Sequence, residues 1–91
     1  MLTLVWRPSA REDLRGIISY IAERNEAAAM NLGQAIEACA ERLPDHPFLY
    51  RTGRVPGTRE AVVHPNYILV YQVTADAVEI VTLVHARQEY P

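Results

Sequence analysis

The hydrophobic spacing of this chain changes near its middle, from the period of a helix to the period of a strand. Before residue 44, apolar residues recur every three or four positions, which is the spacing of one buried helix face. The pattern resets around Asn25, and Ser9 stands three residues before Glu12, the spacing of a capping box. We therefore expect two amphipathic helices, the first beginning near Ser9, joined by a very short turn into an antiparallel hairpin. The two apolar stripes are Leu14, Ile17, Ile18 and Ile21, then Leu32, Ile36, Cys39 and Leu43.

The other apolar segments have the character of strands. Residues 2–6 form a short β-prone run that stops at Pro8, and residues 60–63, 67–74 and 77–84 form three more, separated by tight connections. Residues 44–57 hold three prolines and two glycines without helical spacing, which predicts a surface loop. Nearly every position of 67–73 is apolar, so both faces of that strand are expected to be covered. Strict alternation in the last strand would place Val78, Ile80, Thr82 and Val84 on one side.

The resulting order, β–α–α–β–β–β, predicts an α+β fold in which the N-terminal strand and the helical hairpin pack on a mainly antiparallel sheet. The 91 residues suffice for one core and are too few for a second, so residues 1–91 are assigned to a single domain. Alternating β–α–β units are absent, which argues against a doubly wound parallel sheet.

Composition limits the classes of function. All nine cationic side chains are arginine and the formal net charge is −2, which argues against a non-specific nucleic-acid binder. Cys39 is the only cysteine and the three histidines are dispersed, so we expect no disulfide within the chain, no metal and no cofactor. There is no signal-peptide pattern and no apolar run long enough to span a membrane, so a soluble cytoplasmic protein is expected.

Several short segments, taken together and in order, resemble the RelE/ParE superfamily of toxins from bacterial type II toxin–antitoxin systems, and the ParE-like branch in particular. The resemblance covers essentially the whole chain. Its segments are residues 6–14 (Trp-Arg-Pro-Ser-Ala-Arg-Glu-Asp-Leu), 18–21 (Ile-Ser-Tyr-Ile), 57–60 (Gly-Thr-Arg-Glu), 66–71 (Asn-Tyr-Ile-Leu-Val-Tyr) and 85–88 (His-Ala-Arg-Gln).

The resemblance implies a partner and two possible mechanisms. Such toxins are encoded beside an antitoxin whose C-terminal segment wraps around the toxin, so a hetero-oligomer with a cognate antitoxin is expected. We expect the antitoxin to contribute an apolar and acidic segment that crosses the helices and adds to the sheet edge. ParE-like members inhibit DNA gyrase and are not nucleases, whereas RelE-like members cut mRNA on the ribosome without a metal.

The nuclease hypothesis depends on the end of the last strand. His85 and Arg87 follow it, where some nuclease relatives carry a catalytic His or Arg, and Tyr90 is a further late candidate. Continued extension would put His85 and Arg87 on one face, where an acid or base could work beside a phosphate-binding cation. Alternatively, His85 packs at the sheet edge, Arg87 pairs with an antitoxin acid and Tyr90 is docked or frayed. Ile68 stands where such relatives commonly carry an arginine, which weakens the nuclease hypothesis.

The candidates for target or antitoxin binding lie throughout the chain. Arg59 follows the Gly57 turn and would either contact a partner or form a salt bridge that fixes the loop. Tyr67 and Tyr71, four apart on one strand, are expected to be core aromatics, with base stacking as the alternative. Trp6 is expected to pack under the helices. The complete set of binding candidates is Arg11, Arg15, Arg59, Tyr67, His85 and Arg87.

The sequence therefore supports three hypotheses. The first is a ParE-like toxin that acts by protein–protein contact with gyrase and is not an enzyme. The second is a ribosome-dependent mRNA endonuclease that uses His85 and Arg87. The third is a diverged domain that binds an antitoxin without strong toxicity.

Overall fold

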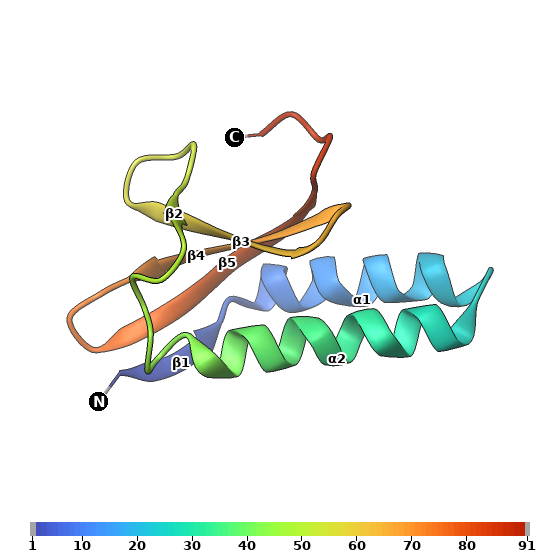
Figure 1. Cartoon of the computed structure of the whole chain (residues 1–91), viewed down its shortest axis with the longest axis horizontal. Helices are drawn as coiled ribbons and strands as arrows, with labels where there is room; N and C mark the ends of the chain where they lie inside the picture. Colours follow the sequence, from blue (N-terminus) through green and yellow to red (C-terminus); the bar gives the residue numbers. More distant parts are fainter. Residues whose placement is uncertain (1, 91) are drawn as a thin grey trace.

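Two helices lie side by side along one face of a five-stranded sheet in the computed structural model, which describes residues 2–90 (Figure 1). The strands are β1 (Thr3–Trp6), β2 (Arg51–Thr52), β3 (Thr58–His64), β4 (Tyr67–Val73) and β5 (Ala77–His85), and the helices are α1 (Pro8–Ala22) and α2 (Glu26–Arg42). The predicted α+β order is confirmed, with β2 as a short additional strand inside the expected loop. No helix within residues 2–90 is long and apolar enough to cross a membrane.

The two helices begin in different ways. The predicted capping box is wrong: α1 starts at Pro8, with Arg7 as an N-cap that makes no side-chain hydrogen bond, so Ser9 already lies inside the helix. Proline is suited to this first position because its ring sets φ near the helical value and it lacks the N–H that would otherwise need a partner. In α2, Asn25 is the N-cap and its side-chain oxygen accepts a 3.0 Å hydrogen bond from the Ala28 N–H.

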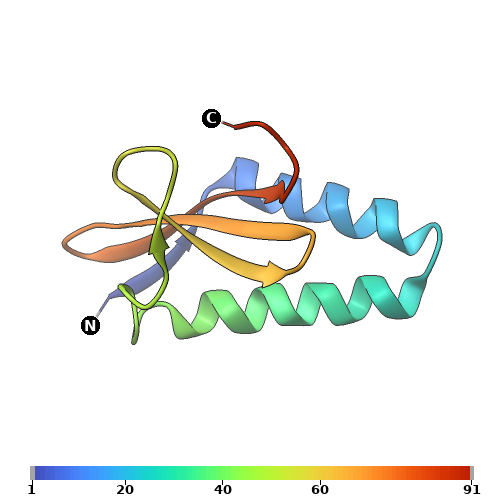
Figure 2. The same cartoon turned by 45° about the horizontal axis from the view of Figure 1, so that its top comes forward.

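The sheet has the strand order β1-β5-β4-β3-β2, with β1 parallel to β5 and every other pair antiparallel. The parallel pair follows from the helical hairpin, which carries the chain away from β1 and back across the sheet before the antiparallel meander begins. Both views show the chain leaving β5 on the side away from the helices (Figure 2). The end of β5 therefore lies between α1 on one face of the sheet and the C-terminal tail on the other.

Strand β4 is buried on both faces, as its sequence predicts. Leu69 and Tyr71 belong to the core under the helices, and the Tyr71 hydroxyl donates to the Pro47 carbonyl at 2.9 Å. Ile68 and Val70 form a second cluster on the other face with Val84. The helices contribute buried side chains to the first core, which agrees with the predicted stripes, and Cys39 is among them at 3% exposed: Leu14, Leu32, Ile36, Cys39 and Leu43.

The predicted alternation of β5 is wrong beyond Ile80. The register passes from Tyr71↔Ile80 to Val70↔Thr82, so Val81 is an extra residue on β5. Such a bulge reverses the inward and outward positions that follow it. Leu83 therefore joins Val78 and Ile80 in the core under the helices, while Val84 lies on the opposite face.

The segment from residue 53 to residue 58 closes tightly between β2 and β3. The Gly53 N–H donates to the Thr58 carbonyl at 2.7 Å, and Gly57 has φ +86°, a conformation that favours glycine. A Cβ on Gly53 would lie 2.3 Å from Thr58 Oγ1 and 3.3 Å from the Thr58 backbone. Thr58 cannot easily yield, because its hydroxyl donates to the Val55 carbonyl at 2.7 Å.

We therefore predict that Gly53→Ala destabilises the protein by about 1–3 kcal/mol, the usual cost of forced overpacking. Gly16→Ala is the matched control: a Cβ there meets nothing within 4 Å, and alanine in the middle of α1 should stabilise by about 0.5–1 kcal/mol. Urea unfolding of both variants measures the two effects. Equal stability of Gly53→Ala and the parent would contradict the close approach.

Candidate functional site at the end of β5

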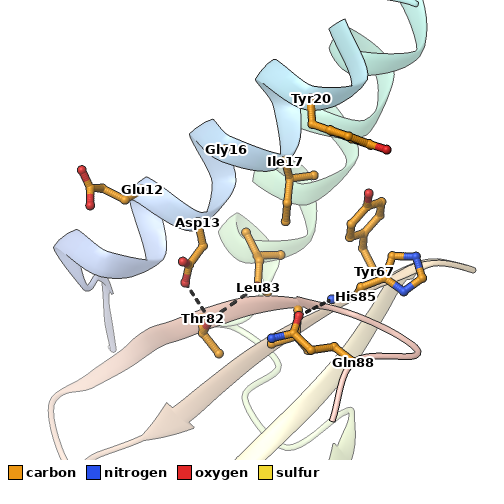
Figure 3. A pocket seen from close by; sticks show the side chains of 11 residues that line it. Glu12, Asp13, Gly16, Ile17, Tyr20, Tyr67, Thr82, Leu83, His85 and Gln88 are labelled. Atoms are coloured by element: carbon orange, nitrogen blue, oxygen red, sulfur yellow. Dashed lines mark hydrogen bonds between the residues drawn. The ribbon is translucent and has the colours of Figure 1, made fainter. Parts of the chain in front are cut away.

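A hollow of about 480 Å³ lies between α1 and the end of β5 (Figure 3). Helix α1 runs over the strand here. The edge of β5 that faces away from β4 has no paired strand beyond Ile80, because β1 pairs with β5 only as far as that residue. The lining comes from α1 and from the sheet with the turn that follows it: Glu12, Asp13, Gly16, Ile17, Tyr20, Tyr67, Thr82, Leu83, Val84, His85 and Gln88.

Carboxylates dominate the charge of this hollow. Glu12 is exposed on α1, and the neighbouring Asp13 accepts a 2.7 Å hydrogen bond from the Thr82 hydroxyl across the hollow. No arginine belongs to the lining, so His85 is the one lining side chain able to carry a positive charge. Such a surface repels phosphate and suits apolar, neutral or cationic groups.

His85 is held by the turn that ends β5. Its Nδ1 accepts a 3.1 Å hydrogen bond from the Arg87 N–H, so a neutral His85 carries its proton on Nε2. The extended geometry required to align His85 with Arg87 does not continue, because the Gln88 N–H donates back to the His85 carbonyl at 2.9 Å. Arg87 is exposed and does not line the hollow. The hollow is thus lined by His85 without Arg87, whereas the nuclease hypothesis requires the two side chains to act together.

Tyr67 lies between this hollow and a second one of about 480 Å³. Its ring is 5.3 Å from the His85 ring and 5.9 Å from the His64 ring, centroid to centroid, and it is half-buried. We call the two hollows together the helix–sheet groove. The second hollow is mainly apolar where the helices line it, and its residues are Ile21, Ala28, Asn31, Leu32, Ala35, His64, Asn66 and Tyr67. Tyr71, by contrast, is fully buried, as predicted for a core aromatic.

Tyr90 lies on the opposite face of the sheet, packed against the cluster of Ile68, Val70 and Val84. Its hydroxyl donates a short hydrogen bond to Glu60 Oε2, and the Arg54 guanidinium is 4.5 Å from its ring centroid. Tyr90 is thus docked, and it does not line the hollow to which His85 belongs. Burial and the neighbouring Glu60 carboxylate raise the pKa of Tyr90 to about 12.

Glu60 is the centre of this second cluster and only 3% exposed. Its carboxylate accepts hydrogen bonds from Arg51 at 2.9 and 3.2 Å and from the Arg54 N–H at 3.1 Å, in addition to the one from Tyr90. Burial alone would raise the pKa of Glu60, but these hydrogen bonds outweigh it and lower the pKa below its usual range. A carboxylate with a lowered pKa is a weak base, and a phenol with a raised pKa is a weak acid, so neither group suits proton transfer. The cluster instead holds the C-terminal tail against the sheet, and we call it the Glu60 clamp.

Sequence reasoning missed this clamp. The sequence predicts Glu60 as the first residue of the strand 60–63, and the one available signal is an acidic residue at the start of an apolar run. The partners on the loop, Arg51 and Arg54, are close to Glu60 only because β2 pairs with β3, with Arg51 opposite Glu60.

The remaining binding candidates do not gather at the helix–sheet groove. Arg11 pairs with Glu37 at 2.8 Å and lies 4.0 Å over the half-buried ring of Trp6, which itself packs against the core. Arg15 is exposed beside a hollow between the two helices. Arg59 donates to the Tyr50 carbonyl at 2.7 Å, so it fixes the loop through a backbone carbonyl where a salt bridge had been considered. Within residues 2–90, no three His, Cys, Asp or Glu side chains are arranged to hold a metal ion.

Comparison with known families gives a match over nearly the whole chain. A family model described as the ParE toxin of type II toxin–antitoxin systems, parDE, matches residues 4–90. The putative toxin Y4kP of Sinorhizobium fredii is 34% identical over 87 residues, covering 94% of this chain and 90% of that protein. Toxin RelE2 of Caulobacter vibrioides is 33% identical over 90 residues, covering 97% of this chain and 99% of that protein.

Solved structures share the fold at low sequence identity. The chromosomal ParDE system from P. aeruginosa has a chain that is similar with a TM-score of 0.82 and 19% identity, covering 93% of this chain and 96% of that one. The YoeB dimer from Staphylococcus aureus is similar with a TM-score of 0.66 and 16% identity, covering 98% of each chain. These likenesses confirm the predicted fold class.

The Glu60 clamp generates a prediction for the pH dependence of stability. Glu60→Gln should destabilise the protein by about 2 kcal/mol at pH 7, because charged hydrogen bonds become neutral ones. The folded-state pKa of Glu60 is lowered, so this contribution is fully present above the unfolded-state pKa and is lost as pH falls through the folded-state pKa. Chemical unfolding from pH 7 to pH 3 should show the two proteins converging at the acidic end. The exposed Glu41→Gln variant controls for loss of an acid, and a constant gap across the range would contradict the clamp.

Proposed function

The chain belongs to the ParE toxin family of type II toxin–antitoxin systems, and we propose that it arrests growth by binding and inhibiting DNA gyrase. It acts in the cytoplasm as a protein ligand, without catalysing a reaction, until a cognate antitoxin neutralises it. The observation that carries this proposal is the charge of the hollow beside His85, where Glu12 and Asp13 lie and no arginine does.

RNA cleavage without a metal requires cations around the scissile phosphate and a nearby acid or base. The hollow at His85 offers two carboxylates in place of those cations, and they would repel the RNA backbone. Arg87 is exposed and does not belong to the lining of the hollow. These features favour gyrase inhibition over ribosome-dependent cleavage of mRNA.

The opposite face of the sheet is equally unsuited to cleavage. Ile68, at the position where nuclease relatives commonly have an arginine, is 3% exposed and packs in the cluster against which Tyr90 lies. Glu60 and Tyr90 are bound to each other, and their pKa values are displaced away from neutrality in opposite directions. Neither side chain is ready to exchange a proton near pH 7.

The helix–sheet groove supports the second half of the proposal, the site of the antitoxin. Its apolar part, with Ile21 and Leu32, suits the apolar face of a peptide that folds on binding. The acidic part favours neutral or basic antitoxin residues opposite Glu12 and Asp13. An acidic stretch of the antitoxin would instead lie near an exposed arginine of the helices, such as Arg15. Strand β1 is an outer strand of the sheet and can accept an added strand.

The direct test is supercoiling of relaxed plasmid by gyrase with the purified, antitoxin-free protein titrated in. We predict inhibition or trapped cleaved DNA at near-stoichiometric protein, and reversal by the antitoxin. A folded and toxic preparation without effect on gyrase would remove it as the direct target. A folded preparation that binds antitoxin but does not arrest growth would support the diverged domain.

The nuclease alternative is tested by replacing both His85 and Arg87 with alanine. We predict that growth arrest and antitoxin binding persist, because the groove lacks the cations that cleavage requires. Growth curves after induction and primer extension on cellular mRNA are the measurements. Loss of growth arrest together with loss of mRNA cleavage, in a variant with unchanged circular dichroism, would favour the endonuclease.

Antitoxin binding in the groove is tested at Tyr20, which is 58% exposed and lines the acidic hollow. Tyr20→Ala should weaken antitoxin binding by about tenfold or more, as for an aromatic anchor in an interface. Val62→Ala is the control, since Val62 is 53% exposed on β3 and does not line the groove. Titration calorimetry gives both affinities, and equal values would argue against this location.

A further inference from the structure

Phe48 and Leu49 are consecutive residues of the loop between α2 and β2, and they are 65% and 68% exposed. Single exposed apolar side chains are ordinary on protein surfaces. Two large neighbours on one loop are less so, because each forgoes the stabilisation that burial would provide. We call these two residues the 48–49 knob.

The loop holds the 48–49 knob in place from both ends. The Pro47 carbonyl accepts from the buried Tyr71 hydroxyl at 2.9 Å, and the Tyr50 carbonyl accepts from Arg59 at 2.7 Å. The Arg59 guanidinium also lies 5.0 Å from the Phe48 ring centroid. A surface that is ordered before binding loses less conformational entropy when a partner docks on it.

The surroundings of the knob are cationic. Residues 46–59 contain three arginines and no acidic residue, and the segment is flanked in the sequence by Asp45 and Glu60. The acid that neutralises Arg51 and Arg54 is Glu60, whose side chain is only 2% exposed, whereas theirs are 58% and 41% exposed. The charge that reaches solvent is therefore arginine, and its remaining N–H groups can donate to carboxylates of a partner.

Shape distinguishes the knob from the helix–sheet groove. A groove accepts a peptide, whereas two projecting side chains on an ordered loop require a partner with a pocket already built to receive them. The two surfaces also lie at opposite ends of β3. Thr58, at the start of β3, lines the same hollow as Phe48, whereas His64, at its end, lines the groove. One molecule can thus contact an antitoxin peptide and a folded protein through separate surfaces.

We propose that the 48–49 knob docks the target of the toxin, a folded protein with an apolar pocket rimmed by carboxylates. This inference rests on the proposed function and adds the surface through which it is carried out. Apolar contact by Leu49 favours a protein pocket over a nucleic-acid backbone, which offers phosphates and no apolar cavity. Aromatic and arginine side chains together are the usual composition of an interface centre.

The test is the double substitution Phe48→Ala and Leu49→Ala in the full chain. Both side chains are exposed, so the midpoint of urea unfolding should match that of the parent. We expect growth arrest to be lost, the concentration for half-inhibition of gyrase supercoiling to rise at least about tenfold, and antitoxin affinity to change less than about twofold. Met30→Ala, on α2 and 65% exposed, is the matched control and should leave all three unchanged.

The possible outcomes separate this inference from the proposed function. Growth arrest by the double variant equal to the parent overturns the knob as the docking surface. Loss of antitoxin affinity with toxicity retained also overturns it, and so does a loss of plasmid-DNA binding measured without gyrase. If the parent arrests growth without affecting gyrase, the gyrase proposal fails, and selective loss of arrest in the double variant still supports the knob. If the parent does not arrest growth, both proposals fail.

Discussion

The burial of β4 on both faces is the constraint on which the rest of this structure depends. Leu69 and Tyr71 need the helical hairpin above them, and Ile68 and Val70 need a cover below. The chain supplies that cover by turning back after His85, so that Tyr90 reaches Glu60. The turn that closes the lower face also holds His85 at the edge of the groove, and one packing requirement thereby shapes both surfaces.

Charge is distributed so that the two ends of β3 differ in character. The helix–sheet groove reaches His64 through its apolar hollow and carries Glu12 and Asp13 in its other hollow, beside α1, whereas near Thr58 the exposed charge is arginine. A chain with a net charge of −2 can therefore present an electropositive surface to one partner and an acidic, partly apolar groove to another. This separation fits a toxin whose antitoxin and target contact different parts of a small domain.

The sequence predicts the fold well because local and periodic signals agree. The helical stripes, the turn at Asn25 and the apolar run of β4 each point to the observed element. The errors have specific causes. Pro8 starts α1 and displaces the expected cap at Ser9, the bulge at Val81 reverses the alternation of β5, and β2 pairs two residues within an expected loop. Propensity and period carry no information about a bulge or a two-residue pairing, since both depend on the neighbouring strand.

The sequence by itself determined the element order, the apolar stripe with which each helix packs on the core and the family to which the toxin belongs. Tertiary structure alone decided which side chains meet. His85, Arg87 and Tyr90 are close in sequence, yet the turn after β5 sends Tyr90 to Glu60 across the sheet and leaves Arg87 in solvent. The physical reason is that hydrophobic period records which residues are buried, whereas contacts between distant charges depend on strand pairing and on where the chain reverses.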